Sequence, residues 1–421
     1  MLKYGATDVN RKFDLATMQY PLSVYMKITG RCMLKCEFCS QYGSIYKDMD
    51  INDAKKFLDE LKDLGVVYIY YTGGEPLMYD NLNILLKYGY ELGFKQLLVT
   101  NGVLFSQKEK RDLAKYLLSV GISLHGTPNM HNKLSGNINC YDKILENIKL
   151  LVEENKDVQI NINCTAVKEN TSYDNFKFLA ELCHKNDWKL TIARLNYIGN
   201  GMSYENINLN DMLEIINKLN LEGYDIKISN CIAPCVIDKK YIYLAHGCGA
   251  GQSIAAIESN GDVKICASSN NVIGNLKRES FKRIWNGKNI KKFKKLGWLP
   301  LYCRECKNFL VCKGGCKAEL SGNFESSFCD SSVSHMFEKE WEKNKNKKIS
   351  LVYGMLRKEK SDLYTIISIP AKKCNKEAKD ILTKIDGTKT GDEVLNESKN
   401  KEKTKELLIT LSIDKIISVE N

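Results

Sequence analysis

Short β-rich segments alternate with helical segments along residues 22–196 of the chain. Six segments are rich in β-branched and aromatic residues and apolar enough to be buried on both faces: LSVYMKIT, VVYIYYT, KQLLVTN, GISLHG, VQININCTAV and KLTIARLN. The segments between them have helical periodicity, among them NDAKKFLDELKDLG, EKRDLAKYLLSVG and CYDKILENIKLLVEEN. Strands that alternate with helices predict a parallel sheet. Six units are too few to close an eight-unit barrel, so the sequence predicts an α/β fold with a partial (β/α)6 TIM-like barrel, open on one side.

Small and polar residues follow the first four predicted strands. The segments are TGRC, TGGEP, TNG and SLHG, in chain order. In parallel barrels, catalytic residues lie at the carboxyl ends of the strands. We therefore expect these four segments to meet at the mouth of the barrel.

The first of these segments begins a C-x3-C-x2-C pattern formed by Cys32, Cys36 and Cys39. A structural zinc site takes four ligands and a disulfide takes two cysteines, so three cysteines fit neither. The chain has 16 cysteines, five histidines, no N-terminal signal segment and no run long enough to span a bilayer. We expect a cytoplasmic protein without a membrane partner, in which clustered cysteines bind metal. Three thiolates would hold three irons of a [4Fe–4S] cluster and leave the fourth open to a small molecule.

This pattern, with Phe38 directly before its last cysteine, resembles the radical S-adenosylmethionine (SAM) superfamily. The TGGEP segment agrees with the resemblance, and its glycines would let the backbone approach the ligand. In that family SAM chelates the open iron through its amino and carboxylate groups. The resemblance implies that five residues contact SAM: Phe38, Gly73, Gly74, Glu75 and Ser123. Ser135 lies near the place where related enzymes often have an arginine, so no arginine contact to SAM is expected.

The resemblance also implies the chemistry. One electron would cleave SAM into methionine and a 5′-deoxyadenosyl radical, which abstracts hydrogen from an unactivated C–H bond. The cofactor performs the difficult step, and the protein positions and shields the reactants. Such a reaction needs a low-potential electron donor such as flavodoxin or ferredoxin.

Seven further cysteines lie between residues 248 and 329 with the spacing C-x12-G-x4-C, C-x2-C-x5-C-x3-C and a final cysteine. This array resembles the SPASM extension of radical SAM enzymes and implies two auxiliary [4Fe–4S] clusters. By resemblance, the nearer cluster is bound by Cys248, Cys266 and Cys316. The farther cluster is bound by Cys303, Cys306, Cys312 and Cys329. Cys231 or Cys235 would complete the nearer cluster, or its last corner is open to substrate; a zinc ribbon is the alternative interpretation.

The remaining cysteines fall in helical or strand patterns, and we expect them to be small buried hydrophobic residues. They are Cys140, Cys164, Cys183 and Cys374.

The sequence predicts five parts. An N-terminal extension (1–20) precedes the radical SAM barrel (21–229), a loop-rich SPASM domain (230–335), a charged connector (336–348) and a small α+β unit (349–421). In the last unit, SLVYGML and LYTIISIP predict strands, and the segment from KEAKDILTK to GDEVLNES predicts two helices around a turn at Asp386 and Gly387. This unit resembles a PqqD-like peptide-recognition element, a winged-helix module that binds a leader peptide by strand addition. A structural cap and a nucleic-acid contact are the alternatives.

SPASM enzymes mostly act on peptides or proteins, so the resemblance implies a radical SAM oxidoreductase that matures a peptide. We expect it to modify a ribosomally synthesised precursor peptide with a leader sequence, by a thioether or carbon–carbon cross-link. Formylglycine formation, as in anaerobic sulfatase maturation, is an alternative, but Ala267 stands where that family commonly has an aspartate base. Dehydrogenation of a small molecule and a non-enzymatic electron carrier are further alternatives. The net charge of +11 is spread along the chain and predicts a solvated surface, so a nucleic-acid partner is not expected.

Overall fold

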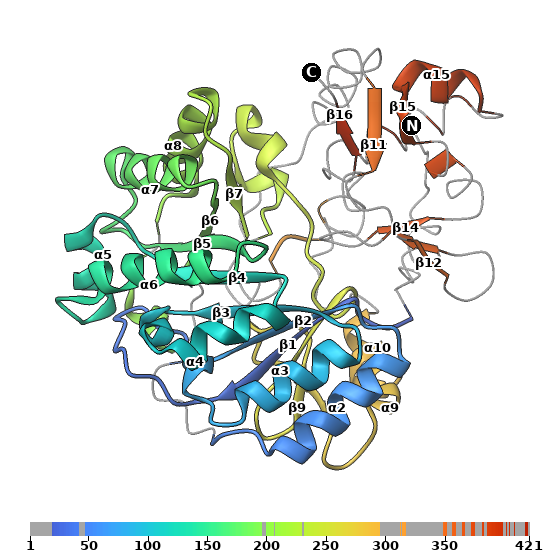
Figure 1. Cartoon of the computed structure of the whole chain (residues 1–421). Helices are drawn as coiled ribbons and strands as arrows, with labels where there is room; N and C mark the ends of the chain where they lie inside the picture. Colours follow the sequence, from blue (N-terminus) through green and yellow to red (C-terminus); the bar gives the residue numbers. More distant parts are fainter. Residues whose placement is uncertain are drawn as a thin grey trace.

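The computed structural model is described for residues 19–41, 47–195, 199–294 apart from 206 and 230, 312, 314–316 and short segments between 348 and 419. Its largest element is a ten-stranded sheet with the order β10-β9-β8-β1-β2-β3-β4-β5-β6-β7 (Figure 1). From β1 to β7, every strand is parallel to its neighbours. The described sheet ends in β7 on one side and β10 on the other, so it does not close. The predicted α/β class with an open partial barrel is confirmed.

The parallel strands and their helices follow the alternation in the sequence. The strands are β1 (Ser23–Thr29), β2 (Tyr68–Gly73), β3 (Lys95–Thr100), β4 (Ser119–Ser123), β5 (Gln159–Ala166), β6 (Lys189–Arg194) and β7 (Ile226–Ile228). The helices are α2 (Ile51–Asp63), α3 (Leu82–Glu91), α4 (Lys108–Arg111), α5 (Pro128–Ser135), α6 (Cys140–Glu154), α7 (Tyr173–Lys185) and α8 (Leu209–Leu221). Each of the six predicted β-rich segments overlaps one of the strands β1 to β6, although β4 begins two residues before its predicted segment.

The prediction of a helix over EKRDLAKYLLSVG (109–121) is wrong for the second half of this segment. α4 ends at Arg111, a 3-10 helix covers Asp112–Tyr116, and β4 begins at Ser119. The residues of β4 pair with β3, for example Val120 with Leu98. Tertiary strand pairing therefore overrides the helical period at this point.

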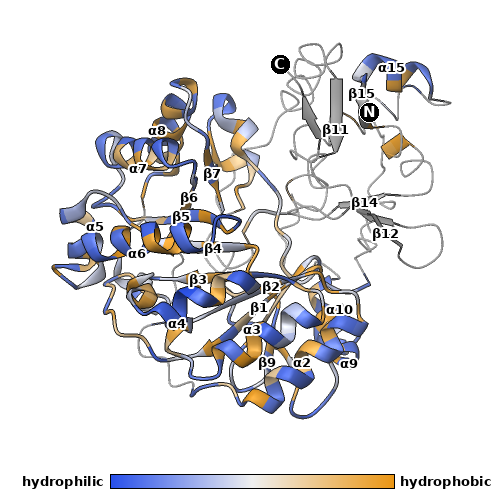
Figure 2. Ribbon diagram, viewed as in Figure 1, coloured by the Kyte–Doolittle hydropathy of each residue, from blue (hydrophilic) through white to orange (hydrophobic). Residues whose placement is uncertain are grey.

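Helix α2 shows how the outer layer is held. The Asp50 side chain caps it by accepting hydrogen bonds from the N–H groups of Asn52 and Asp53. Its buried stripe joins the same hydrophobic cluster as alternate residues of β1. The stripe consists of Ala54, Phe57, Leu58 and Leu61, and the β1 residues are Val24, Met26 and Ile28. Figure 2 shows apolar and polar residues on different sides of the helices that surround the sheet.

Residues predicted to be loop-rich add three strands to the same sheet. They are β8 (Ile254–Ile257), β9 (Asp262–Lys264) and β10 (Val272–Asn275), followed by α9 (Phe281–Trp285) and α10 (Lys288–Lys294). β8 is parallel to β1, and the next two strands are antiparallel. The loop-rich prediction is therefore wrong for residues 254–294, because strands of three or four residues are too short to show a period.

Beyond residue 348, the described segments form two small antiparallel sheets with the orders β15-β11-β16 and β12-β13-β14. Their strands are β11 (Lys348–Leu351), β12 (Leu356–Lys358), β13 (Tyr364–Ile366), β14 (Lys372–Cys374), β15 (Asp386–Thr390) and β16 (Ile417–Val419). The predicted turn at Asp386 and Gly387 is wrong, because both residues lie in β15. α15 (Gly391–Asn396) follows at once, and Thr390 and Glu393 form its capping box.

Within the part of the chain that is described, no helix has both the length and the apolar composition needed to cross a bilayer.

Candidate active site

The loop that carries Cys32, Cys36 and Cys39 leaves the carboxyl end of β1, as predicted. Backbone hydrogen bonds tie it to two other parts of the barrel mouth: Glu37 N–H donates to the Leu134 carbonyl at 3.2 Å, and Asn200 N–H donates to the Cys39 carbonyl at 3.1 Å. Cys32 is exposed and the other two thiols are partly buried. The loop is thus fixed from α5 and from the segment after β6, while one thiol stays open to solvent.

Glycines at the end of β2 allow a third connection. Gly74 N–H donates to the Thr29 carbonyl at 2.8 Å, and Glu75 N–H donates to the Arg31 carbonyl at 2.6 Å. A Cβ on Gly74 would lie 2.2 Å from the Arg31 carbonyl oxygen. The sequence predicted close approach to a ligand at these glycines. In the structure, the group that approaches Gly74 is the backbone of the cysteine loop.

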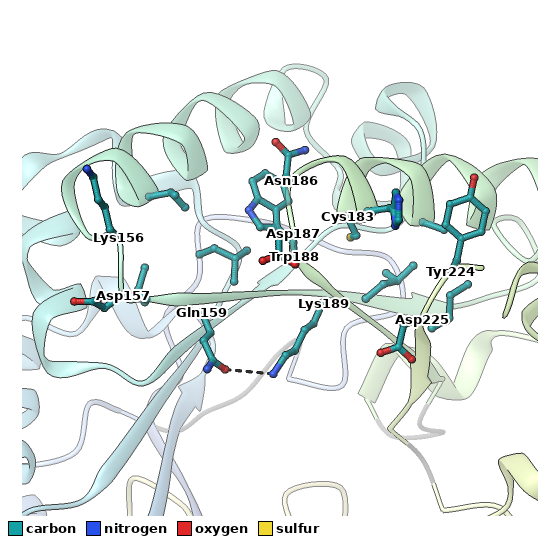
Figure 3. Close-up of a pocket in the computed structure, with 17 residues that line it drawn as sticks. Lys156, Asp157, Gln159, Cys183, Asn186, Asp187, Trp188, Lys189, Tyr224 and Asp225 are labelled. Carbon is teal, nitrogen blue, oxygen red and sulfur yellow. Dashed lines mark hydrogen bonds between the residues drawn. The ribbon is translucent and has the colours of Figure 1, made fainter. Parts of the chain in front are cut away.

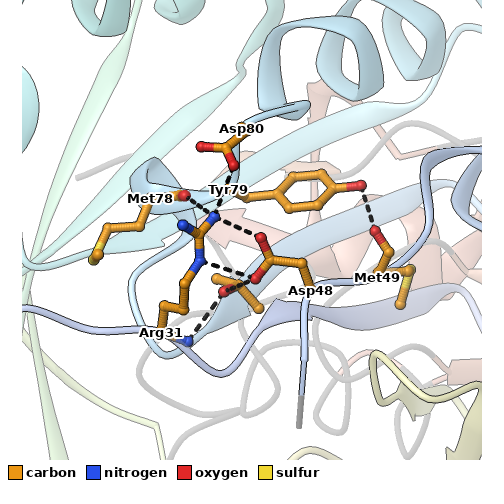
Figure 4. A network of polar contacts seen from close by, with 7 residues as sticks. Arg31, Asp48, Met49, Met78, Tyr79 and Asp80 are labelled. Atoms are coloured by element: carbon orange, nitrogen blue, oxygen red, sulfur yellow. Dashed lines mark hydrogen bonds and ion pairs between the residues drawn. The ribbon is translucent and has the colours of Figure 1, made fainter.

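Arg31 holds the start of the same loop (Figure 4). Its Nε and Nη2 donate to the two carboxylate oxygens of Asp48 at 3.1 and 2.5 Å. Nη2 also reaches the Met78 carbonyl at 2.6 Å and the Asp80 carboxylate at 3.2 Å. The Asp48 hydrogen bond raises the pKa of Arg31, so the guanidinium stays charged. Because the Arg31 side chain is 44% exposed, water screens its ion pairs and they contribute little to the free energy of unfolding. The role of this network is to fix the position of the loop.

The three thiols lie close enough to affect one another. Burial raises the pKa of Cys36 to about 12, and the charges of Cys39 and Cys32 add to the effect. Burial also raises the pKa of Cys32, again with a contribution from Cys39. Three neighbouring thiolates repel one another unless cations lie between them. The three thiols therefore fit an iron–sulfur cluster, because its irons would compensate the negative charges and favour the thiolate forms.

Glu75 is almost fully buried, and its carboxylate joins the ends of β2 and β3. It accepts hydrogen bonds from Thr100 Oγ1 at 2.6 Å, Asn101 N–H at 2.8 Å and Leu77 N–H at 3.0 Å. Burial raises the pKa of Glu75, and these hydrogen bonds oppose the rise. The predicted SAM contact of Glu75 stays a prediction.

Asn101, from the TNG segment, was not predicted as a site residue. Its Nδ2 lies 3.9 Å from Cys32 Sγ and 3.2 Å from Met33 Sδ. Its backbone N–H is held by Glu75. The third predicted strand end therefore reaches the cysteine loop through this side chain.

The fourth strand end supplies an aromatic and histidine cluster. The ring centroids of Phe38 and His125 lie 4.8 Å apart, edge to face, and Phe38 packs with Leu134, Val167 and Leu195. Burial lowers the pKa of His125 well below its usual value, and its Nδ1 accepts from Thr165 N–H at 3.2 Å. His125 is therefore a neutral structural group beneath the cysteine loop. The predicted SAM contacts of Phe38 and Ser123 remain predictions, and both residues lie at this end of the barrel.

The inner face of the sheet is polar and partly open. Along β5 the alternate residues Ile160, Ile162, Cys164 and Ala166 are buried, whereas Asn161, Asn163 and Thr165 are only half-buried. Asn161 Nδ2 donates to Asn163 Oδ1 at 2.9 Å, and Thr191 Oγ1 donates to Asn161 Oδ1 at 3.0 Å. The interior of a closed eight-stranded barrel is packed with side chains. Asn161, Asn163 and Thr165 therefore keep part of their polar surface exposed on this face of the sheet.

Four cysteines of the second array lie among the described residues. They are Cys248, Cys266, Cys312 and Cys316, while Cys303, Cys306 and Cys329 lie outside the described residues. No group of three or more His, Cys, Asp or Glu side chains in the described part is arranged to hold a single metal ion. The predicted ligand sets of the two auxiliary clusters therefore stay predictions.

The segment from Cys231 to Cys235 lies beside this array. Ile232 N–H donates to the His246 carbonyl at 3.2 Å. A Cβ on Gly315 would lie 3.2 Å from the Cβ of Ala233. The two candidate ligands, Cys231 and Cys235, thus lie on either side of Ala233. Ala233 lies close to Gly315, the residue directly before Cys316.

The other predicted buried cysteines that are described behave as expected. Cys140, Cys164 and Cys183 are buried. Burial raises the pKa of Cys183 to about 12, so it stays a neutral thiol.

A cavity of about 660 Å³ lies at the opposite end of the strands (Figure 3). Its lining includes Asp157 and Gln159 before and in β5, Trp188 and Lys189 at the start of β6, and Asp225 before β7. Because active sites of parallel barrels lie at the carboxyl ends of the strands, we do not assign the reaction to this cavity.

Comparison with known proteins gives two family matches. Residues 26–183 match the model of the radical SAM superfamily. Residues 248–307 match the SPASM model, described as an iron-sulfur cluster-binding domain. The two matches cover the cysteine loop and the start of the second array.

Curated relatives include PqqA peptide cyclase from Bradyrhizobium diazoefficiens, 25% identical over 321 residues, which are 72% of this chain and 83% of the relative. GTP 3′,8-cyclase from Clostridium perfringens is 29% identical over 200 residues, 46% of this chain and 61% of the relative.

Similar solved structures include Streptococcus suis SuiB bound to the precursor peptide SuiA, with a TM-score of 0.63, 21% identity and coverage of 77% and 78% of the two chains. Another is anSMEcpe with bound AdoMet, with a TM-score of 0.55, 19% identity and coverage of 77% and 93%. These structures share the fold of this chain.

Proposed function

We propose that this chain modifies a ribosomally synthesised precursor peptide by forming a thioether or carbon–carbon cross-link, since residues 26–183 match the radical SAM superfamily model and residues 248–307 match the SPASM model. The observation that carries this proposal is the polar, partly open inner face of the sheet below the cysteine loop. The similarity to PqqA peptide cyclase supports a peptide substrate, because it extends over 72% of this chain.

In this proposal the cysteine loop binds the first cluster through Cys32, Cys36 and Cys39. SAM is bound by the backbone of Gly73, Gly74 and Glu75 at the end of β2, by Phe38 of the cysteine loop and by Ser123 at the end of β4. When bound, the clusters and SAM supply one-electron cleavage and a hydrogen-abstracting radical. The protein's own side chains position these groups: the hydrogen bonds of Arg31 and of Glu75 hold the cysteine loop next to the ends of the neighbouring strands.

Two auxiliary clusters are part of the proposal. The nearer takes Cys248, Cys266 and Cys316, with Cys231, Cys235 or an open corner as its last position. The farther takes Cys303, Cys306, Cys312 and Cys329. A cytoplasmic location and a low-potential electron donor such as flavodoxin or ferredoxin also belong to the proposal, because exposed cluster cysteines need a reducing compartment.

We assign leader binding to the carboxyl-terminal unit, residues 349–421. Its described strands β12, β13 and β14 form an antiparallel sheet in which β12 and β14 each pair with β13. A sheet of this kind can extend by one strand when a peptide adds to an edge. A tethered leader would keep the core peptide near the barrel mouth and make its entry effectively intramolecular.

The test uses the peptide encoded by a short open reading frame beside the gene, incubated with reduced protein and SAM without oxygen. We expect 5′-deoxyadenosine and a peptide that has lost two hydrogen atoms for each cross-link, measured by mass spectrometry. The Cys32/Cys36/Cys39 triple alanine variant is the control and should give neither product. A Ser or Cys of the peptide oxidised to formylglycine, with no cross-link, would replace this proposal with the sulfatase-maturase alternative.

A variant that lacks residues 349–421 tests leader binding separately. It should bind the peptide more weakly and still cleave SAM without peptide, because the proposed cluster and SAM sites lie in the first two domains. Full peptide affinity and an unchanged rate in this variant would contradict the assignment of the leader site.

A further inference from the structure

Two buried lysines share one carboxylate oxygen on the inner side of the sheet. Lys27 Nζ lies 2.9 Å from Glu258 Oε1, and Lys264 Nζ lies 2.6 Å from the same oxygen. The exposed fractions of the three side chains are 8%, 10% and 1% for Lys27, Lys264 and Glu258. The three residues, called the lysine–glutamate triad below, are the most deeply buried charged group among the described ion pairs.

Strand pairing brings the triad together across a long stretch of sequence. Lys27 lies on β1, and Glu258 directly follows β8, whose Ile257 pairs with Met26. Lys264 lies on β9, which pairs antiparallel with β8. The triad therefore fixes β1, β8 and β9 to one another from the inner face.

The formal charge of the triad is +1, from two ammonium groups and one carboxylate. Burying a charge costs several kcal/mol unless an opposite charge compensates for it. Burial lowers the pKa of Lys27 and the neighbouring Lys264 adds to this effect, whereas the carboxylate of Glu258 acts in the opposite direction. Glu258 is therefore the group that compensates for the buried ammonium groups.

The position of Cys266 identifies the group that the extra positive charge serves. Cys266 follows Lys264 by two residues, so the loop after β9 carries it directly away from the triad. Tyr25, which shares the inner face of β1 with Lys27, has its pKa raised to about 12 by burial, with further contributions from Cys266 and Cys231. Through Lys264, the triad thus lies two residues from a proposed cluster ligand.

We propose that the lysine–glutamate triad raises the reduction potential of the auxiliary cluster that Cys266 binds. A fixed positive charge in a medium of low dielectric constant stabilises the form of a neighbouring cluster that carries one more electron. Glu258 holds both ammonium groups in place and sets the net charge at +1. This inference rests on the proposed function, since it requires an auxiliary cluster at Cys266.

The experiment is a redox titration followed by electron paramagnetic resonance on the full-length, reconstituted protein. Lys27→Met and Lys264→Met each reduce the net charge of the triad to zero and should lower the midpoint potential of one auxiliary signal. Glu258→Gln increases the net charge to +2 and should raise it. The double variant Lys27→Met/Glu258→Gln restores +1 and should return the midpoint close to that of the unchanged protein.

Lys277→Met is the matched control. Lys277 lies beyond β10, is half-exposed and pairs with Asp53, so its removal should shift no midpoint. The restoration by the double variant separates charge from structure, because structural damage from two substitutions would not cancel.

The outcomes are distinguishable. Iron near four atoms per chain would overturn both the proposed function and this inference. Iron near 12 atoms with unchanged midpoints, or with shifts of one sign in all variants, would overturn this inference alone. Variants that weakened peptide binding without moving a midpoint would also overturn it, because the charges would then serve a substrate carboxylate.

Discussion

Replacing Gly74 with alanine should displace the cysteine loop and remove the first cluster. The added Cβ would lie 2.2 Å from the Arg31 carbonyl oxygen and 2.8 Å from that of Gly30. Ordinary contact begins at 3.4 Å, so the loop has to move by about 1.2 Å, the difference between 3.4 and 2.2 Å. Both obstructing atoms belong to backbone, so no side-chain rotation relieves the contact.

The size of this displacement decides between two effects. Overpacking of this kind costs roughly 1–3 kcal/mol in stability, which a chain of this length can survive. Metal sites, in contrast, need ligand distances correct to about 0.2 Å. A movement of about 1.2 Å at Arg31, directly before Cys32, exceeds that tolerance several-fold. We therefore expect a folded protein that has lost one cluster.

The assay is iron content after anaerobic reconstitution. Three four-iron clusters give about 12 iron atoms, and Gly74→Ala should retain about eight, with the auxiliary signals intact. Gly287→Ala is the control, because its Cβ would lie 3.1 Å from the carbonyl oxygens of Arg283 and Ile284, which requires a movement of only a few tenths of an ångström. If Gly74→Ala retained about 12 irons and bound SAM with unchanged affinity, the packing argument would be refuted.

Two further predictions concern a ligand and a titrating group. Cys231→Ala should lower the iron content toward about eight or alter the signal of the nearer auxiliary cluster, because Cys231 and Cys266 both contribute to the raised pKa of Tyr25. Cys235→Ala is the control and should change neither the iron content nor the signal. An unchanged signal in both variants would indicate that the last corner of the cluster is open. Burial lowers the pKa of His131 from 6.5 to about 4, so the unfolded chain takes up a proton first as the pH falls between these values. The free energy of unfolding should then decrease by up to ~1.4 kcal/mol per pH unit. His131→Gln should reduce this slope in urea unfolding at about pH 7.5 and 5.5, and an unchanged slope would exclude His131 as its source.

The barrel could be predicted because its signals are local. Each of β1 to β6 carries its own apolar run, and the cysteines, glycines and polar residues that follow each run identify the strand ends. The sheet extends further in a way that the sequence does not indicate: β8, β9 and β10 have only three or four residues each. Of these three strands β8 pairs with β1, through long-range contacts such as that between Met26 and Ile257.

The candidate site could be predicted in its residues but not in its connections. The sequence predicted close approach of the Gly74 backbone to a ligand, which stays a prediction. The close neighbour that the structure shows is the backbone of Arg31. The Arg31–Asp48 pair and the lysine–glutamate triad join residues that are 17 and up to 231 positions apart. Charged residues at such separations have no pattern in one sequence, because nothing local selects one carboxylate among many.

Strand β1 connects the two proposed metal sites. Its carboxyl end leads into the loop of Cys32, Cys36 and Cys39, and its inner face carries Lys27 of the triad, whose Lys264 lies two residues before Cys266. On one side it pairs with β2, which is followed by Gly74, and on the other it pairs with β8, which leads to Glu258 of the triad. Because both neighbours are hydrogen-bonded to the same seven-residue strand, the separation of the two sites is set by backbone geometry. In the proposed reaction, a substrate that meets the radical at one site and passes an electron toward the other would do so across a distance that strand β1 and its neighbours fix.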